Sequence, residues 1–475
     1  MIYRPKTGSM WDPSLIYHDG KYYAFMMYNL DGPNGLGAGH CIAASSVDGV
    51  HWEDIGIVNE ELERERGCLF FKCFVGRCGD RFIMDHGVRR PEGQDTIRFY
   101  ESFDLKNWNY LFSNEPDARW YSRKRWDHMY ILPKVDGDDT AGYWGHPVAK
   151  AKEDLPRGVG MMQSEDGLSW EVLPPAKVEW GGTPPVDLEW GGCERFGGRY
   201  YLIGGGKTMG NKGYGMYVFS ADDPCGPFTP ERGAYRLCGS SERDMSWLAV
   251  WCRGDGELLI SNYASLEPDS RAPWMLPLRK PVMHEGYLSL GWWEGNEKLK
   301  GDPFQINSAS FSIDSVGNKN EYAIEWMDDE FDLSRGLFLE GSLKARSTAA
   351  GNGDFAAGFA LSQEGSRSTV IKLGIGSRVD RETHIGDLVE TDDGFEFTSN
   401  DVTARDCATV NGIGDGTEHS FKLLIHRGAF ELYIDGLLMQ THWHNPVGKK
   451  IGFFTSNSSL IVNGLEAWSL SLNGS

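Results

Sequence analysis

The chain lacks paired cysteines, long apolar runs and an excess of positive charge. Its nine cysteines are an odd number, and none of them forms a Cys-x-x-Cys pair. Cys73 and Cys78 have no matching Cys or His pair at the spacing of a zinc site. The cysteine pattern therefore predicts reduced thiols in a cytoplasmic protein, and we expect no metal ion and no cofactor.

Nucleic acids and membranes are not expected as partners. Acidic residues outnumber basic ones by 68 to 47, and a net charge of −21 repels phosphate backbones and anionic lipid headgroups. No apolar run approaches the roughly 18 residues of a membrane-spanning helix. The start, MIYRPKTGSMWDP, lacks the apolar core of a signal peptide, so we expect no export signal unless the numbering is that of a mature secreted form.

Glycine, proline and aromatic residues, by contrast, are abundant. The 475 residues include 60 glycines and 21 prolines, and 12% of them are aromatic. This mixture favours strands joined by tight turns over long helices. Since the length also exceeds that of most single domains, the sequence predicts a mostly β protein with two or more cores.

A short motif repeats in the first half of the chain. Serine, aspartate two residues later and tryptophan four further on occur in SSVDGVHWE (45–53), ESFDLKNW (101–108) and QSEDGLSWE (163–171), with a weaker copy in FSADDPCGPF (219–228). Five glycine-led hairpins with alternating aromatic and aliphatic residues also recur. Four strands in every 40 to 60 residues or so are typical of a β-propeller blade. Two stacked β-sandwiches would explain the strands but not the repeat.

The repeat ends before residue 305, and short alternating strands such as FELYIDGLLMQT (430–441) follow it. Seven or more such strands are typical of a β-sandwich. We therefore predict a five-bladed β-propeller over residues 1–295, a linker over 296–307 and a β-sandwich over 308–475. We expect the sandwich to be a scaffold that covers the propeller and assists dimerisation into a homo-oligomer; carbohydrate binding is the alternative role.

Three carboxylates occupy matching places in the repeat. Asp12 and Glu189 lie eight and nine residues before the glycine of their hairpins, and Asp127 lies fifteen before its own. The second and fifth repeats have no acidic residue there, but Phe-Lys-Cys at 71–73 and Ser-Trp at 246–247. Because the innermost strands of all blades border one channel, we expect the three carboxylates to converge there.

Converging carboxylates suit glycoside hydrolysis. One carboxyl group protonates the leaving oxygen, while a second attacks the sugar or activates water. A third can hold sugar hydroxyls. Each carboxylate also adjoins a tryptophan, whose indole suits the apolar face of a sugar. The alternative is that each one is a turn residue; nearby Glu194 is expected to be structural, paired with Arg195 or Arg199.

This pattern resembles the glycoside hydrolases that share a five-bladed propeller, families 32, 43 and 68, over almost the whole chain. Family 32, which contains invertases, inulinases and levanases, is most similar because it joins the propeller to a C-terminal β-sandwich. Its Trp-Met-Asn-Asp-Pro-Asn motif is matched by MWDPS (10–14), its Arg-Asp-Pro motif loosely by RWD (125–127), and its Glu-Cys motif at Glu189 alone. WMLPLRKPVMHEGYLSL (274–290) resembles the segment between its two domains.

The resemblance implies an exo-acting, retaining hydrolase that removes a terminal furanoside, such as a β-fructofuranoside, from an oligosaccharide or small glycoside. By position, Asp12 is the nucleophile, Glu189 the acid/base and Asp127 the stabiliser of the transition state. The residues expected to bind the sugar are Trp11, Arg125, Trp126, His128 and Trp190. Because two motifs are incomplete, three alternatives stay open: an inverting arabinofuranosidase or xylosidase of family 43 with Asp12 as general base, a glycoside phosphorylase, and a non-catalytic sugar-binding propeller.

Overall fold

Strands dominate the structure, a computed structural model. It describes residues 2–29, 40–58, 69–155, 158–180, 187–207, 215–231, 236–239, 248–264, 273–315, 322–348, 355–363, 365, 367–374, 383–391, 394–403, 413–443 and 448–472. Within these ranges the single helix is the 3-10 helix η2 (Glu294–Leu299). None of the described helical structure has the length and apolarity needed to cross a membrane.

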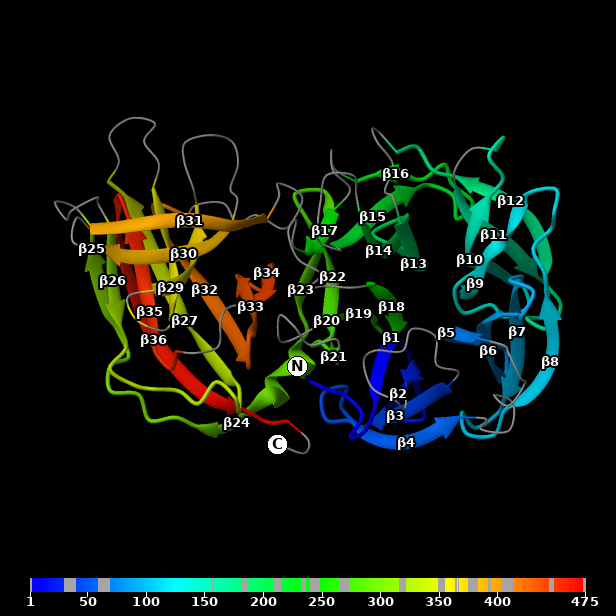
Figure 1. The fold of residues 1–475 in the computed structure, drawn as a ribbon, viewed down its shortest axis with the longest axis horizontal. Helices are drawn as coiled ribbons and strands as arrows, with labels where there is room; N and C mark the ends of the chain where they lie inside the picture. Colours follow the sequence, from blue (N-terminus) through cyan, green and yellow to red (C-terminus); the bar gives the residue numbers. More distant parts are fainter. Residues whose placement is uncertain are drawn as a thin grey trace.

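Five groups of antiparallel strands form the blades of a propeller (Figure 1); four are separate sheets, and the fifth is one end of an 11-stranded sheet. The first three blades contain β1 (Ser9–His18), β2 (Lys21–Asn29), β3 (His40–Ser46) and β4 (Glu53–Val58); β5 (Leu69–Cys78), β6 (Arg81–Arg89), β7 (Asp95–Ser102) and β8 (Asn109–Asn114); and β9 (Tyr121–Pro133), β10 (Tyr143–Ala151), β11 (Gly158–Ser164) and β12 (Glu171–Lys177). The last two contain β13 (Asp187–Phe196), β14 (Arg199–Lys207), β15 (Gly215–Ala221), β16 (Thr229–Pro230) and β17 (Arg236–Gly239); and β18 (Val250–Arg253), β19 (Leu258–Ser261), β22 (Arg279–His284) and β23 (Tyr287–Trp292), beside the short pair β20 (Tyr263–Ala264) and β21 (Trp274–Met275).

One strand from each blade borders the central channel. β1 contacts β5 and β18, β5 contacts β9, and β13 contacts both β9 and β18, so the five innermost strands close a ring. Apolar side chains fill the spaces between neighbouring blades; Phe25 of the first blade meets Trp108 of the second edge to face, with 5.7 Å between ring centroids. This arrangement excludes two stacked sandwiches and confirms the propeller.

The repeated Ser-x-Asp motif forms one kind of turn between the third and fourth strands of a blade. In the first blade, Ser46 Oγ accepts from the N–H of Gly49 at 2.8 Å, and Asp48 Oδ1 accepts from the N–H three residues further on, also at 2.8 Å. Gly49 has a φ of 74°, and the indole of Trp52 donates to its carbonyl oxygen at 3.1 Å. In the second blade Leu105 occupies the glycine position with a φ of 60°. The motif therefore fixes the outer turn of the first three blades and leaves the inner strands to form the channel.

Two packed sheets form the C-terminal part of the chain, as predicted for a β-sandwich. Phe359 and Phe421, from opposite sheets, meet with their ring centroids 5.0 Å apart in its core. One sheet has β34 (Leu437–Trp443), β33 (Ala429–Ile434), β32 (Asp415–His426), β27 (Leu337–Ser347), β36 (Ser458–Leu470) and β24 (Lys300–Pro303) in that order, with β25 (Phe311–Asp314) also on β36. The other has β26 (Tyr322–Trp326), β35 (Ile451–Ser456), β28 (Ala356–Ser362), β29 (Arg367–Leu373), β30 (Thr383–Thr391) and β31 (Gly394–Thr403).

The propeller and the sandwich share a sheet. Gly291 of β23 pairs with Leu437 of β34, so the fifth blade continues into the first sheet of the sandwich. Arg279 of the blade and Glu431 of the sandwich form an ion pair across this junction, and both side chains are 0% exposed. The predicted linker, 296–307, contains part of η2 and strand β24, which pairs with β36. The two parts are therefore joined by backbone pairing and by buried charge.

Candidate active site

Asp12, Asp127 and Glu189 lie on the innermost strands of the first, third and fourth blades, β1, β9 and β13. Lys72, on the innermost strand β5 of the second blade, interacts electrostatically with all three carboxylates. Asp12 also interacts with Glu189 directly. The structure therefore brings the three carboxylates together around one lysine in the channel. The matching place in the fifth blade, 246–247, lies outside the described residues.

A bulge aims Asp12 at the channel. Its backbone has a φ of 52°, and the register of β1 against β2 shifts where Pro13 follows it. Proline cannot donate to the strand ladder and is tolerated at bulges, which re-aim side chains. The phenol of Tyr263, from the fifth blade, donates a hydrogen bond to Asp12 Oδ1. Burial raises the pKa of Asp12 and Glu189 adds to the effect, while Lys72 and the hydrogen bond from Tyr263 oppose it.

Asp127 is held as a carboxylate by the residue that follows it. Its Oδ1 accepts from the backbone N–H of His128 at 2.8 Å, and the imidazole Nδ1 lies 3.4 Å from the same oxygen. Burial raises the pKa of Asp127, but the imidazole and the N–H of His128 outweigh it and hold the pKa well below its usual range. A Cβ at Gly87 would lie 2.0 Å from this oxygen, so glycine is needed there.

Glu189 is oriented by an arginine from the neighbouring blade. The guanidinium of Arg125 donates to Glu189 Oε1 at 2.5 Å. Arg125 has a φ of 69°, and its backbone N–H donates to Asp95 Oδ2 at 2.6 Å, which holds this strained residue in place. Asp95 is itself paired with Arg89 at 2.7 Å. Asp95 and Arg89 thus support the residue that orients Glu189.

Lys72 is the main member of the site that the sequence did not predict. Its side chain is 2% exposed, and Nζ lies 4.3 Å from the centroid of the Phe74 ring. Nζ has no hydrogen-bond partner among the described residues. Burial lowers the pKa of Lys72, and its attraction to the three carboxylates opposes that effect. Lys72 stands in the second repeat at the place that matches those of the three carboxylates, but a pattern of carboxylates does not predict a lysine.

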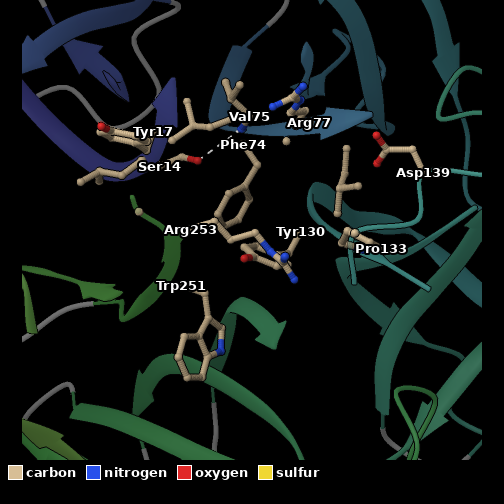
Figure 2. Close-up of a pocket in the computed structure, with 16 residues that line it drawn as sticks. Ser14, Tyr17, Phe74, Val75, Arg77, Tyr130, Pro133, Asp139, Trp251 and Arg253 are labelled. Carbon is tan, nitrogen blue, oxygen red and sulfur yellow. Dashed lines mark hydrogen bonds between the residues drawn. The ribbon is translucent and has the colours of Figure 1, made fainter. Parts of the chain in front are cut away.

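Phe74 separates the carboxylates from the far end of the channel. Its ring, 2% exposed, lies 5.0 Å from that of His128 and 5.6 Å from that of Tyr130, centroid to centroid. Beyond it lies a cavity of about 460 Å³, whose lining includes Tyr130, Trp251 and Arg253 (Figure 2). Figure 2 shows the Phe74 ring pointing inward between β5 and these residues. The candidate site is therefore closed at its base.

Two of the predicted sugar-binding tryptophans do not face the channel. Trp126 and Trp190 are 0% and 4% exposed and pack in the cores between blades. Successive side chains of a strand point to opposite faces, so a residue beside a channel-facing carboxylate points away from the channel. This prediction was wrong for both. His128 is 2% exposed and its Nδ1 lies 3.4 Å from Asp127 Oδ1, so it is buried and acts on that carboxylate.

The predicted place of Trp11 agrees with the structure, whereas the predicted partners of Glu194 do not. Trp11 is half-buried and meets the ring of Tyr263 edge to face at 6.3 Å between centroids, so it remains beside Asp12. Glu194 is 1% exposed and structural as expected, but its partners were predicted wrongly. They are Arg253 at 2.6 Å, on the adjacent inner strand, and the phenol of Tyr130, also at 2.6 Å.

Comparison with known proteins places the whole chain within one fold. No protein-family model and no curated protein matched the sequence. Among solved structures, the family 32 β-fructofuranosidase of Bombyx mori aligns with a TM-score of 0.67 and 15% identity, over 98% of this chain and 92% of that one. The sucrose-6-phosphate hydrolase of Lactobacillus gasseri aligns with a TM-score of 0.68 and 14% identity, over 98% and 92%. Fructan 1-exohydrolase IIa of Cichorium intybus aligns with 0.68 and 13% identity, over 98% and 96%.

The chain has the fold of these enzymes. Both the five-bladed propeller and the following sandwich are covered, so the resemblance to glycoside hydrolase family 32 holds for the architecture of the entire chain. At 13 to 15% identity the likeness extends to the fold alone.

Proposed function

We propose that the protein is a retaining, exo-acting glycoside hydrolase that removes a terminal furanoside, such as a β-fructofuranoside, from an oligosaccharide. The observation that supports this most is the gathering of Asp12, Asp127 and Glu189, from three blades, around the buried Lys72. Burying several charges at one point of a channel is unfavourable for folding, so such a cluster is a candidate for function. In a solved structure with this fold, a mutant of the Bombyx mori β-fructofuranosidase is in complex with sucrose.

In the proposed mechanism Asp12 is the nucleophile. Tyr263 holds Oδ1, so Oδ2 is available to attack the anomeric carbon and form a covalent glycosyl-enzyme. The nucleophile must be ionised, and Lys72 and Tyr263 favour that form against the effect of burial. Asp127, whose low pKa keeps it ionised, accepts hydrogen bonds from sugar hydroxyls and stabilises the positive charge of the transition state.

Glu189 is the acid/base. In the first step it gives its proton to the leaving oxygen, and Arg125 stabilises the carboxylate that results. In the second step the Glu189 carboxylate takes a proton from water, whose oxygen attacks the anomeric carbon and breaks the bond to Asp12. The sugar leaves with its original configuration, and both carboxyl groups return to their starting states.

Exo action is proposed because the site ends at Phe74. A channel that is closed at its base holds the terminal sugar and has no room for a further sugar beyond it, while the rest of the chain leaves through the open end. Only the terminal sugar would then reach the carboxylates.

The test is a substrate screen with detection of the product anomer. Sucrose, inulin, levan, an arabinofuranoside and a xyloside are assayed with the wild-type protein and with Asp12→Asn and Glu189→Gln. We expect a fructoside to be cleaved with retention, and Glu189→Gln to lower kcat by about 10²–10⁴-fold. Asp19→Asn is the matched control, because this exposed turn residue lies on the same hairpin as Asp12.

Each other outcome contradicts a stated part of the proposal. Inversion would make Asp12 a general base, and cleavage of the arabinofuranoside or xyloside alone would replace the fructoside. Release of oligosaccharides from inulin would contradict exo action. Binding of sugars without any cleavage would mean a non-catalytic propeller.

A further inference from the structure

Two cysteines and a histidine are buried together between the first and second blades. Cys41 lies on β3, Cys73 on β5 and His86 on β6, where Cys73 and His86 are paired in register. Their exposed fractions are 1%, 0% and 4%. One potential ligand atom from each lies within 4.8 Å of the other two. Three strands from two blades thus present two thiols and an imidazole at one point in the core.

The distance between the sulfurs is closer to that of a shared metal ion than to that of a disulfide. Cys41 Sγ and Cys73 Sγ are 3.4 Å apart. Two thiolates that bind one tetrahedral zinc ion, each at about 2.3 Å, lie roughly 3.8 Å apart. A disulfide requires about 2.05 Å and gives a neighbouring imidazole nothing to bind. Small adjustments would therefore complete a metal site, whereas a disulfide would require a larger movement.

The electrostatics of the cluster also suit a cation. The hydrogen bond with Cys73 lowers the pKa of Cys41 to about 6, against the effect of burial, and the imidazole of His86 acts in the same direction as Cys73. The same hydrogen bond, together with burial, raises the pKa of Cys73, so the cluster favours one thiolate beside one thiol. A thiolate is the form that binds metals. His86 Nδ1 is buried and has no hydrogen-bond partner among the described residues, which is unusual for a polar atom in a protein core.

We propose that Cys41, Cys73 and His86 bind one thiophilic d10 metal ion, Zn²⁺ or Cu⁺, which joins the first two blades. Binding releases the remaining thiol protons, and two thiolates with a neutral imidazole then balance a divalent charge in the core. Soft thiolate ligands favour these ions over Mg²⁺ or Ca²⁺. The three residues supply three ligands, so Zn²⁺ would add a water molecule as the fourth, whereas Cu⁺ would not.

The spacing of these residues explains why the sequence did not indicate the site. Zinc motifs place their ligands in pairs two to five residues apart, whereas positions 41, 73 and 86 are brought together only by the packing of one blade on the next. None of the three has a role in the proposed hydrolysis, so this proposal does not depend on it.

The experiment measures metal in the full-length protein, produced without a metal-affinity tag in medium supplemented with zinc or with copper. We expect close to one ion per chain by plasma mass spectrometry in one of the two preparations. Refolding with Co²⁺ should give an intense thiolate-to-metal charge-transfer band. Metal uptake should weaken as the pH falls, because the ligands must lose their protons.

Substitutions test whether the proposed residues are the metal ligands. Cys73→Ser and His86→Gln should each lose most of the bound metal and the cobalt band. Cys193→Ser is the matched control, because Cys193 is equally buried but lies between the third and fourth blades, and it should keep both. If a variant fails to fold, the metal content and cobalt spectrum of the wild type decide on their own.

Two outcomes would overturn the proposal. The first is wild-type protein without metal from both media and without a cobalt band. The second is a count of seven thiols in the denatured protein in place of the nine cysteines of the sequence, with a disulfide mapped between Cys41 and Cys73.

Discussion

The phenol of Tyr263 donates a hydrogen bond to Asp12 across 251 residues of sequence and closes the site between the last blade and the first. This bond occupies one carboxylate oxygen and favours the ionised form of Asp12. It also fixes the other oxygen in the channel, where the proposed attack on the sugar takes place.

Removing this hydroxyl should therefore slow the reaction without abolishing it. A hydrogen bond to a charged group contributes about 1.5–3 kcal/mol, so Tyr263→Phe should lower kcat by about 10- to 150-fold with a smaller change in KM. Steady-state kinetics on the best substrate of the screen measure this. Tyr17→Phe is the control, because Tyr17 lines the cavity beyond Phe74 (Figure 2) and should leave kcat unchanged. Equal losses in both variants would contradict the role of Tyr263.

Lys72 should set the acidic limit of activity. The reaction needs ionised Asp12, so activity falls as the pH drops through the raised pKa of Asp12. Lys72 lowers that pKa, and Lys72→Met, which removes the charge above the Phe74 ring but keeps a side chain of similar length, should raise it further. The acidic limb of the plot of kcat/KM against pH should then move to higher pH.

A second stacked lysine provides the control for that profile. Lys134 lies over the ring of Trp144 at 4.5 Å, outside the carboxylate cluster, and Lys134→Met should leave the limb in place. A profile of Lys72→Met with an unmoved acidic limb and only a lower plateau would show that Lys72 does not act through Asp12.

Substituting the tryptophans beside the carboxylates should affect stability at Trp126 and sugar binding at Trp11. Trp126 is fully buried, so Trp126→Ala should cost about 3–5 kcal/mol of unfolding free energy, measured by urea denaturation. Trp11 is half-buried beside the site, so Trp11→Ala should raise KM for the sugar at a smaller cost in stability. A raised KM for Trp126→Phe in a protein of normal stability would restore the original prediction for that residue.

In the ion pair between the propeller and the sandwich, removing one partner should destabilise the protein more than removing both. Arg279→Met leaves Glu431 buried without its cationic partner and should cost about 3–5 kcal/mol. The double variant Arg279→Met/Glu431→Leu should recover most of this loss, because it removes both charges. The control is Lys280, which follows Arg279 on β22 and forms a partly exposed ion pair with Glu294. Lys280→Met should cost at most about 1 kcal/mol of unfolding free energy. Additive losses in the double variant would contradict the coupling.

Counting along the repeat predicted the blades and the place of Asp12, Asp127 and Glu189, because each blade repeats one order of strand and turn. The same count leads to Lys72 in the second repeat, but a lysine does not belong to a pattern of carboxylates. It could not reach Tyr263, which follows the hairpin of its blade and enters the site from the short pair β20 and β21.

The other errors have two physical origins, the alternation of side chains along a strand and the contacts between neighbouring blades. Trp126 and Trp190 were assigned by adjacency in sequence, but adjacent residues of a strand face opposite sides. Glu194 was given partners close in sequence, whereas its partner Arg253 comes from the next blade. Residues brought together only by the closing of the ring leave no local pattern in the sequence.

During translation the blades of this ring are synthesised one after another. Asp12 leaves the ribosome 251 residues before the Tyr263 that holds it, and the sandwich that buries Glu431 against Arg279 follows later still. A nascent chain of four blades carries all three carboxylates but cannot close the ring around them. The appearance of hydrolytic activity during synthesis would therefore report the docking of the fifth blade.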